Sequence, residues 1–194
     1  MQKKGKIILG IIVAVIIIFG IMYISLVSSK TIKAQLDIET GTVFVNGEKV
    51  IESVVLGKGD SIETFEDGLA TIILYESVVV SLEPNTKINI DDLTKEHLQL
   101  SQTSGETWNT ITKLFGVGDY TIKSGNSVAS VRGTSFIFNV EKIIVFSGEI
   151  DYKIDNQSFK VLENNVIEKV DGEIKERGLT EEEKRKILDV KIEQ

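Results

Sequence analysis

The chain has 194 residues and a formal net charge of −7, because 29 Asp and Glu outnumber 22 Lys and Arg. It contains no cysteine, which excludes disulfides, thiolate nucleophiles and Cys-ligated metals, and its single histidine excludes multi-histidine metal sites. An acidic chain is a poor binder of nucleic acid, whose phosphates are neutralised by clustered Lys and Arg. We therefore expect no nucleic-acid partner, no cofactor and no enzymatic activity.

The N-terminal region has the pattern of a membrane segment. Residues 7–27 carry no charge and are mostly Ile and Val, and as a helix they would span the roughly 30 Å hydrocarbon core of a bilayer. Three lysines within residues 1–6 favour a cytoplasmic N-terminus. The alternative is a cleaved signal peptide with a weak small-residue site at residues 27–29, but the apolar core of such peptides usually has only about 7–15 residues.

This pattern predicts a single-pass protein of the plasma membrane. We expect a cytoplasmic stub over residues 1–6, a transmembrane helix over 7–27, a connector over 28–40 and an extracytoplasmic body.

From residue 41 to about residue 175 the chain has the texture of an all-β domain. Short β-branched runs are separated by turn signals such as Asn46-Gly47 and Asp171-Gly172, which supply the positive φ angles that tight hairpins require. Residues 87–91 alternate apolar and polar side chains, as a strand with one wet face does. A dozen or so strands with no helical period between them predict a β-sandwich or barrel rather than an alternating βαβ fold.

The alternation changes phase at one place. Ala129 and Val131 occupy odd positions, whereas Phe136 and Phe138 occupy even ones. A period of two changes phase only through an extra residue, so a bulge or corner is expected at residues 132–134, with Gly133 absorbing the unusual backbone angle.

The last segment, residues 179–194, predicts a short helix and tail. Thr180 and Glu183 have the spacing of a capping box, in which each side chain satisfies a free N–H group of the first turn. We favour a helix packed against the sandwich over a separate docking element.

Few side chains suggest chemistry. His97 lies on the polar phase of an alternating strand and is expected to be solvated. The acidic pair Asp91-Asp92 and the run 181–183 lack the loop spacing of a calcium site. Trp108 would stack on a sugar or a partner if exposed, but a buried sheet tryptophan is the commoner arrangement. The sequence thus identifies no catalytic, cofactor-binding or metal-binding residue and no small-molecule substrate.

Arg132 lies at the phase change and allows two interpretations. An exposed arginine would serve a partner, whereas an arginine paired with a carboxylate across the sheet would fix the corner. We favour the second, which predicts that Arg132→Ala destabilises the domain rather than removing binding alone.

Five segments in order resemble the FecR-domain family. Residues 128–136 resemble its "A-x-V-R-G-T-x-F" hallmark, residues 57–64 its "G-D-x-I-x-T" segment, and residues 82–86 its "L-x-P-N-T" turn. Residues 105–108 are similar to its "G-x-v-W" strand and residues 145–150 to its "v-x-x-G-x-V" hairpin. One departure is Glu76-Ser77, where many members have an Asp-Gly turn.

The resemblance implies a jelly-roll-like β-sandwich over residues 41–175, lying outside the cytoplasm. The family-hallmark positions, which we expect to be structural, are Gly59, Asp60, Thr64, Pro84, Asn85, Thr86, Trp108, Val131, Arg132, Gly133, Thr134 and Phe136. The best-known relatives sense a loaded outer-membrane receptor and control a sigma factor through a cytoplasmic domain. Six residues before the membrane segment are too few for such a domain, so we do not expect the sigma-binding role to carry over.

The sequence therefore predicts a membrane-anchored, non-enzymatic module for sensing or protein binding. The alternative is a structural envelope or surface-assembly component that self-associates through its β domain. A protein partner or a second copy of the chain is expected in either case, with the membrane as the site of anchoring.

Overall fold

The computed structural model describes residues 16–19, 34–74, 78–94, 96–112 and 118–193. Residues 16–19 are helical, and the rest of the predicted transmembrane segment, residues 28–33 of the predicted connector and the Glu76-Ser77 departure lie outside the described residues. Within the described ranges, no helix is long and apolar enough to cross a membrane.

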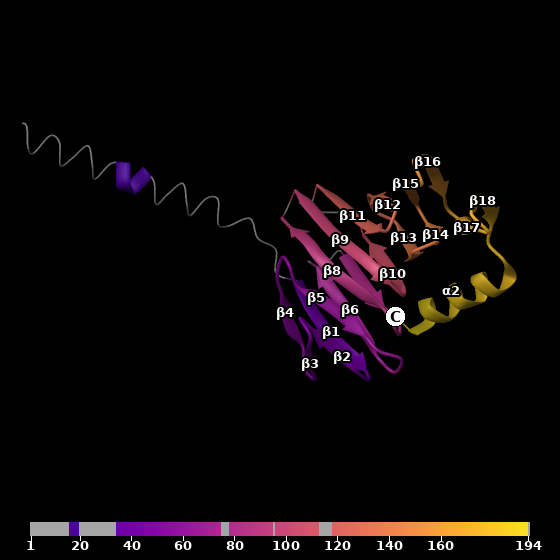
Figure 1. Cartoon of the computed structure of the whole chain (residues 1–194). Helices are drawn as coiled ribbons and strands as arrows, with labels where there is room; N and C mark the ends of the chain where they lie inside the picture. Colours follow the sequence, from indigo (N-terminus) through magenta and orange to yellow (C-terminus); the bar gives the residue numbers. More distant parts are fainter. Residues whose placement is uncertain (1–15, 20–33, 75–77, 95, 113–117, 194) are drawn as a thin grey trace, which may run out of the picture. The chain divides into compact units, whose positions relative to one another are not determined.

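The strands form two nine-stranded sheets (Figure 1). Sheet 1 contains, in spatial order, β4 (Val54–Leu56), β1 (Ala34–Thr40), β6 (Leu69–Leu74), β7 (Val78–Leu82), β10 (Glu106–Ile111), β13 (Ser135–Asn139), β14 (Lys142–Ser147), β17 (Asn165–Val170) and β18 (Glu173–Gly178). Sheet 2 contains β3 (Glu48–Val50), β2 (Val43–Val45), β5 (Ser61–Thr64), β8 (Lys87–Leu93), β9 (His97–Ser104), β11 (Asp119–Ser124), β12 (Ser127–Val131), β15 (Glu149–Ile154) and β16 (Gln157–Leu162). The predicted all-β sandwich is confirmed.

The topology follows the chain closely. From β6 onward, pairs of consecutive strands are added to alternate sheets, with β10 as a single insertion, and among the described strands only β9 and β11 pair in parallel. A jelly roll instead winds the chain through Greek keys, so that successive strands are not laid down as neighbouring hairpins. The jelly-roll part of the prediction is therefore wrong, although two packed sheets are present.

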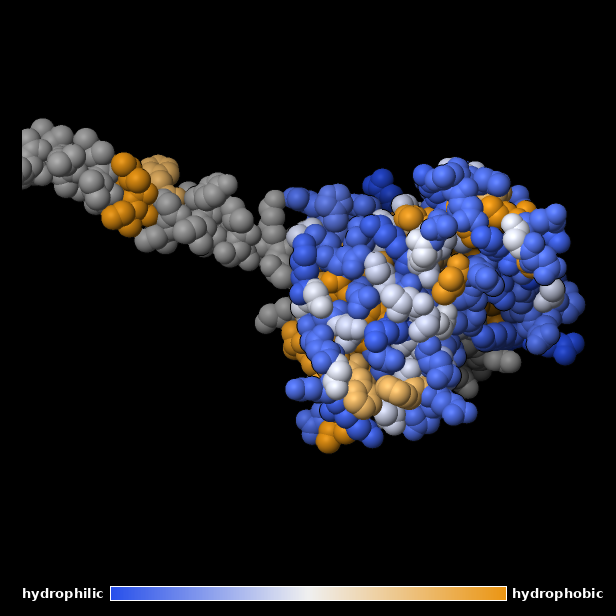
Figure 2. Space-filling view, in the orientation of Figure 1, coloured by the Kyte–Doolittle hydropathy of each residue, from blue (hydrophilic) through white to orange (hydrophobic). Residues whose placement is uncertain are grey.

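The core fills the space between the sheets because one face of nearly every strand is apolar. Phe136, Phe138, Tyr120 and Tyr152 are among its largest fully buried side chains. The Tyr120 hydroxyl donates a 2.7 Å hydrogen bond to Asn109 Oδ1, which satisfies two polar groups in the interior. Polar side chains dominate the surface, and the apolar ones on the face drawn in Figure 2 are scattered.

The N-terminal boundary of the β domain differs from the predicted one. Residues 34–40, predicted as connector, form β1, which pairs with β4 and β6 and fully buries Ala34 and Leu36. At the other end β18 extends the sheet to Gly178. Residues 34–39 alternate apolar and polar side chains, as a strand with one wet face does, so the signal for β1 was present in the sequence.

The predicted corner lies between the sheets. β12 belongs to sheet 2 and β13 to sheet 1, so the chain crosses the sandwich at residues 132–134, where Gly133 has a φ of 78°. The change of phase seen in the sequence falls at this crossing, as predicted.

The C-terminal helix α2 (Glu181–Glu193) begins with the predicted capping box. The Glu183 amide donates to Thr180 Oγ1 over 3.2 Å, and the Thr180 amide donates to Glu183 Oε2 over 2.8 Å. Ile187 packs on the outer face of sheet 1. The prediction of a helix packed against the sandwich is confirmed.

Candidate interaction site

The β12–β13 corner holds four of the predicted site residues. Val131 is buried in the core and Phe136 is fully buried beyond the corner. Thr134 is buried and its hydroxyl donates a 2.8 Å hydrogen bond to the Glu149 carbonyl, which ties the corner to β15. These residues have the structural role expected of them.

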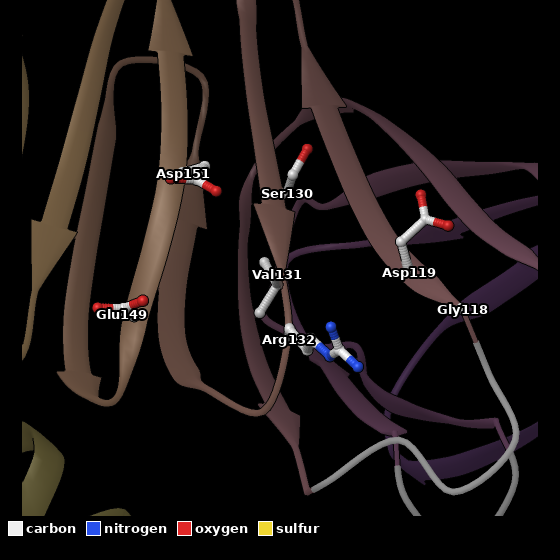
Figure 3. A pocket seen from close by; sticks show the side chains of 7 residues that line it. All are labelled: Gly118, Asp119, Ser130, Val131, Arg132, Glu149 and Asp151. Atoms are coloured by element: carbon white, nitrogen blue, oxygen red, sulfur yellow. The ribbon is translucent and has the colours of Figure 1, made fainter.

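Arg132 has a different environment from the one predicted. Its side chain is exposed, and it forms no ion pair or hydrogen bond with any described residue. In Figure 3 it extends from the end of β12, between β15, which carries Glu149 and Asp151, and β11, which carries Asp119. The preferred interpretation of a corner-fixing ion pair is thus wrong, because none of these carboxylates pairs with Arg132.

A hollow of about 380 Å³ surrounds this arginine on the outer face of sheet 2. It is lined by Gly118, Asp119, Ser130, Val131, Arg132, Glu149 and Asp151. A second hollow of about 550 Å³ adjoins it, shares Ser130 and Asp151, and is lined by Val128, Tyr152 and Phe159 among others. Together they make a continuous concave surface over β11, β12, β15 and β16, which we call the sheet 2 hollow.

Half of the charged residues that line the sheet 2 hollow are paired. Glu149 lies 2.9 Å from Lys160 Nζ, and this carboxylate raises the pKa of Lys160. Asp119 Oδ1 lies 2.7 Å from His97 Nδ1, so the histidine is solvated as predicted but has a carboxylate partner. Asp151, Lys153 and Arg132 have no ion pair among the described residues. Two cations and one anion thus remain available to a ligand that carries both charges.

A second group of predicted residues ties together the loops between the sheets. Thr64 and Thr86 are buried, and the Thr86 amide donates a 2.9 Å hydrogen bond to Thr64 Oγ1. Thr64 Oγ1 donates to the Glu83 carbonyl over 2.7 Å. Thr86 Oγ1 donates to the Glu106 carbonyl over 3.0 Å and accepts from the Glu106 amide over 3.1 Å. The hydroxyls thus satisfy backbone groups where the chain crosses between sheets.

The remaining hallmark residues shape turns. Asn85, after Pro84, has a φ of 59°, a left-handed angle that asparagine tolerates. Gly59 has a φ of 94°, and Asp60 accepts hydrogen bonds from the Gly57 amide and, over 2.8 Å, from Asn46 Nδ2. None of these residues faces the sheet 2 hollow.

Trp108 is buried, as the sequence favoured. It lies on the outer face of sheet 1 with Ile187 of α2, and its ring centroid is 5.8 Å from that of Phe146. Lys186 Nζ lies 5.3 Å from the centre of the indole ring. This tryptophan therefore contacts the chain's own helix.

The sheet 2 hollow was not predicted as a whole. Its acidic residues lie on the exposed phase of β15, where alternating charges look like ordinary solvated surface. Val131 and Arg132 were the members that the sequence singled out. Among the described residues no group of three acidic or imidazole side chains could hold a metal ion.

A family model described as "FecR protein" matches residues 60–166, which is more than half of the chain. The chain belongs to the FecR family. The match contains the corner, the threonine loops and most of the sheet 2 hollow, whereas β1 to β4 and α2 lie outside it.

Two crystal structures share the FecR fold, each described as a predicted anti-sigma factor from Parabacteroides distasonis. Each superposes with a TM-score of 0.57 at 16% identity over 66% of this chain. The match spans 63% and 64% of those chains, less than two thirds of their length. No curated protein matches the sequence.

Proposed function

We propose that this FecR protein is a membrane-anchored, non-enzymatic module that displays its β domain outside the cytoplasm and binds a protein partner through the sheet 2 hollow. Membership of a family with regulatory members, and fold neighbours described as predicted anti-sigma factors, favour signalling over catalysis. The uncharged segment 7–27 with its preceding lysines supports the anchored topology.

The observation that carries the binding role is the exposed, unpaired Arg132. A guanidinium with five donors and no acceptor among the described residues can form a bidentate bond with a partner's carboxylate. Arginine is among the residue types that most often dominate protein interfaces. Asp151 beside it would receive a basic side chain of the same partner.

The alternative function is self-association as an envelope or surface-assembly component. The open edge strand β16 favours it, because Leu162 is 50% exposed there and the strand carries a single charge, Lys160. The edge strand of the other sheet, β18 of sheet 1, consists mostly of charged residues, which discourages pairing between copies.

Topology is tested by protease treatment of intact cells, or of spheroplasts, that carry the full chain with a C-terminal tag. Loss of the tag without lysis supports display outside the cytoplasm. Protection of the tag until the cells are lysed would refute both the sensing and the surface-assembly functions.

Binding is tested by placing a photo-crosslinking residue at Ser130, which lines both parts of the sheet 2 hollow. A heterologous adduct that disappears with Arg132→Ala supports partner binding. An adduct only between copies of this chain would instead support self-association. As a control, the same label at exposed Glu176 of β18 should give neither adduct.

A further inference from the structure

The outer face of sheet 1 carries an apolar strip that α2 covers. Trp108 of β10, Ile137 of β13, Ile144 of β14 and Val166 of β17 lie side by side there and are all at most 6% exposed. Among the described side chains of α2, residues 181–188, Ile187 is the one buried against them. This strip of the outer face of sheet 1 is covered by a helix, whereas Val55 of β4 on the same face is 68% exposed.

Charges at the two ends of the strip fix the direction of the helix. At one end Arg177 binds Glu183 through both terminal nitrogens, at 2.8 and 2.9 Å, and Lys142 Nζ lies 3.9 Å from the same carboxylate. At the other end Glu106 Oε1 accepts a 2.7 Å bond from Lys186. The strip therefore selects a helix with an acid in its first turn and a base one turn later, which also suits the helix dipole.

Two observed features weaken the docking of α2 on the strip. Leu188 next to Ile187 is 58% exposed, and a helix of 13 residues is only marginally stable without packing. The buried Trp108 Nε1 has no hydrogen-bond acceptor among the described residues, an arrangement that disfavours the closed state. A helix that offered an acceptor at this point would bind better than α2 does.

We propose that the strip is a docking groove for an amphipathic helix of a partner protein, and that α2 occupies it until the partner displaces it. The partner helix carries an acid in its first turn, a base three residues later, an aliphatic residue beside the base and an acceptor facing Trp108. The groove lies on sheet 1, whereas Arg132 lies on sheet 2, and the groove can be tested without a natural partner. Failure of this proposal would therefore leave the function proposed above untouched, and the reverse also holds.

The test uses a labelled peptide with the sequence of residues 178–194 and the full chain in detergent micelles. In the chain variant Ile187→Asp, the chain's own helix cannot seat, so the groove is free. We expect the peptide to bind this variant at least about tenfold more tightly than the unmodified chain, in which the tethered α2 competes at high effective concentration. A peptide that itself carries Ile187→Asp is the control and should not bind. Fluorescence of Trp108, the only tryptophan, reports occupancy of the groove.

Charge reversal tests whether the bound helix places the position of Lys186 opposite Glu106. A peptide with Lys186→Glu should bind Ile187→Asp weakly but recover on the double variant Ile187→Asp, Glu106→Lys. Lys186→Glu in the full chain gives a second open variant with an unaltered apolar core, should Ile187→Asp fail to fold. Absence of peptide binding to both folded variants, or binding indifferent to charge, would overturn the proposal. So would peptide-sensitive dimers of the unmodified chain, because the occupant would then be a second copy.

Discussion

The Thr86 hydroxyl is fully buried where the chain passes from sheet 1 to sheet 2, and it satisfies both backbone groups of Glu106. Thr86→Val keeps the shape and removes these bonds. We expect a loss of about 1–3 kcal/mol in the free energy of unfolding, because the Glu106 amide loses its acceptor, whereas the Glu106 carbonyl keeps the Glu83 amide as a donor. Urea unfolding followed by circular dichroism measures it.

The control for this substitution is Thr103→Val in the neighbouring strand β9, where the side chain is exposed. It should change stability by less than about 0.5 kcal/mol. If Thr86→Val and Thr103→Val lowered the free energy of unfolding equally, the buried hydrogen bonds of Thr86 would contribute nothing beyond the effect of β propensity.

Arg132 and Gly133 are neighbours in the chain, but we expect their substitutions to change stability by different amounts. Because Arg132 has no partner among the described residues, Arg132→Ala should change stability by less than about 0.5 kcal/mol while it abolishes crosslinking in the sheet 2 hollow. Gly133→Ala meets no atom within 4 Å but must keep a φ of 78°, so it should cost about 1–2 kcal/mol through backbone strain alone. Thermal unfolding of both variants separates the two roles.

The opposite result for Arg132 would restore the corner-fixing role that its sequence position suggested. A melting temperature lowered as far as that of Gly133→Ala would require an ion pair that forms in solution. Arg132→Lys should retain part of the binding, because it keeps the charge but loses the bidentate fork.

At the scale of the element, α2 is held by a carboxylate whose pKa is strongly shifted. Hydrogen bonds from Arg177, and then from Thr180, lower the pKa of Glu183 from its ordinary value near 4.5 to about 2. A lowered pKa stabilises the docked helix fully above pH 4.5, and this stabilisation is lost as the pH falls from 4.5 toward 2. Arg177 also lowers the pKa of Glu168, but both residues belong to sheet 1, so this shift stabilises the sheet rather than the docking of α2.

We therefore expect Trp108 fluorescence to change between about pH 4.5 and 2 as α2 undocks, while the far-ultraviolet signal of the strands persists. Glu183→Gln should weaken docking already at neutral pH and flatten this acid transition. The matched control is Glu182→Gln in the same turn, where the side chain is exposed, and it should leave the transition in place. A transition unaffected by Glu183→Gln would show that another group controls docking.

For the whole molecule, the boundary of the β domain has a direct experimental consequence. A fragment of residues 32–194 keeps β1, whereas a fragment that begins at the predicted boundary, residue 41, loses it. Without β1, the buried Ile72 and Leu74 of β6 lose their neighbours, and each exposed side chain of this kind costs about 1.5–3 kcal/mol. We expect the longer fragment to unfold in one cooperative transition and the shorter one to aggregate. A stable, soluble 41–194 fragment would contradict this.

The fold class, the corner and the helix cap could be predicted because each is a local pattern. Alternation of side chains defines a strand, a phase change defines a crossing, and the Thr180–Glu183 spacing defines a cap. The family motifs, moreover, are mostly turns and buried hydroxyls, whose sequence is dictated by backbone geometry near the motif itself.

The sheet 2 hollow and the partner of Arg132 could not be predicted, because they depend on which strands become neighbours. Glu149 and Asp151 are close to Arg132 in sequence, yet the register of β12 against β15 decides which of them it could meet. The same limit applies to strand order, since hairpin signals do not say which sheet a hairpin joins. Contacts between elements are set by packing, on which a single sequence carries little information.

The order of the strands also bears on how the domain acquires its structure. The widest-spaced pair of strand residues in the described part joins Ala34 to Leu74, so nearly all ladders connect near neighbours along the chain. Ladders that close shorter loops cost less chain entropy than ladders between the two ends of a domain would, which favours faster folding. Growth from β1 toward β18 means that the first ladders can close while later residues are still leaving the ribosome or the export channel. The helix α2 follows the sheets along the chain, so it docks after they have formed. The strip that contains Trp108 is buried only once α2 has docked.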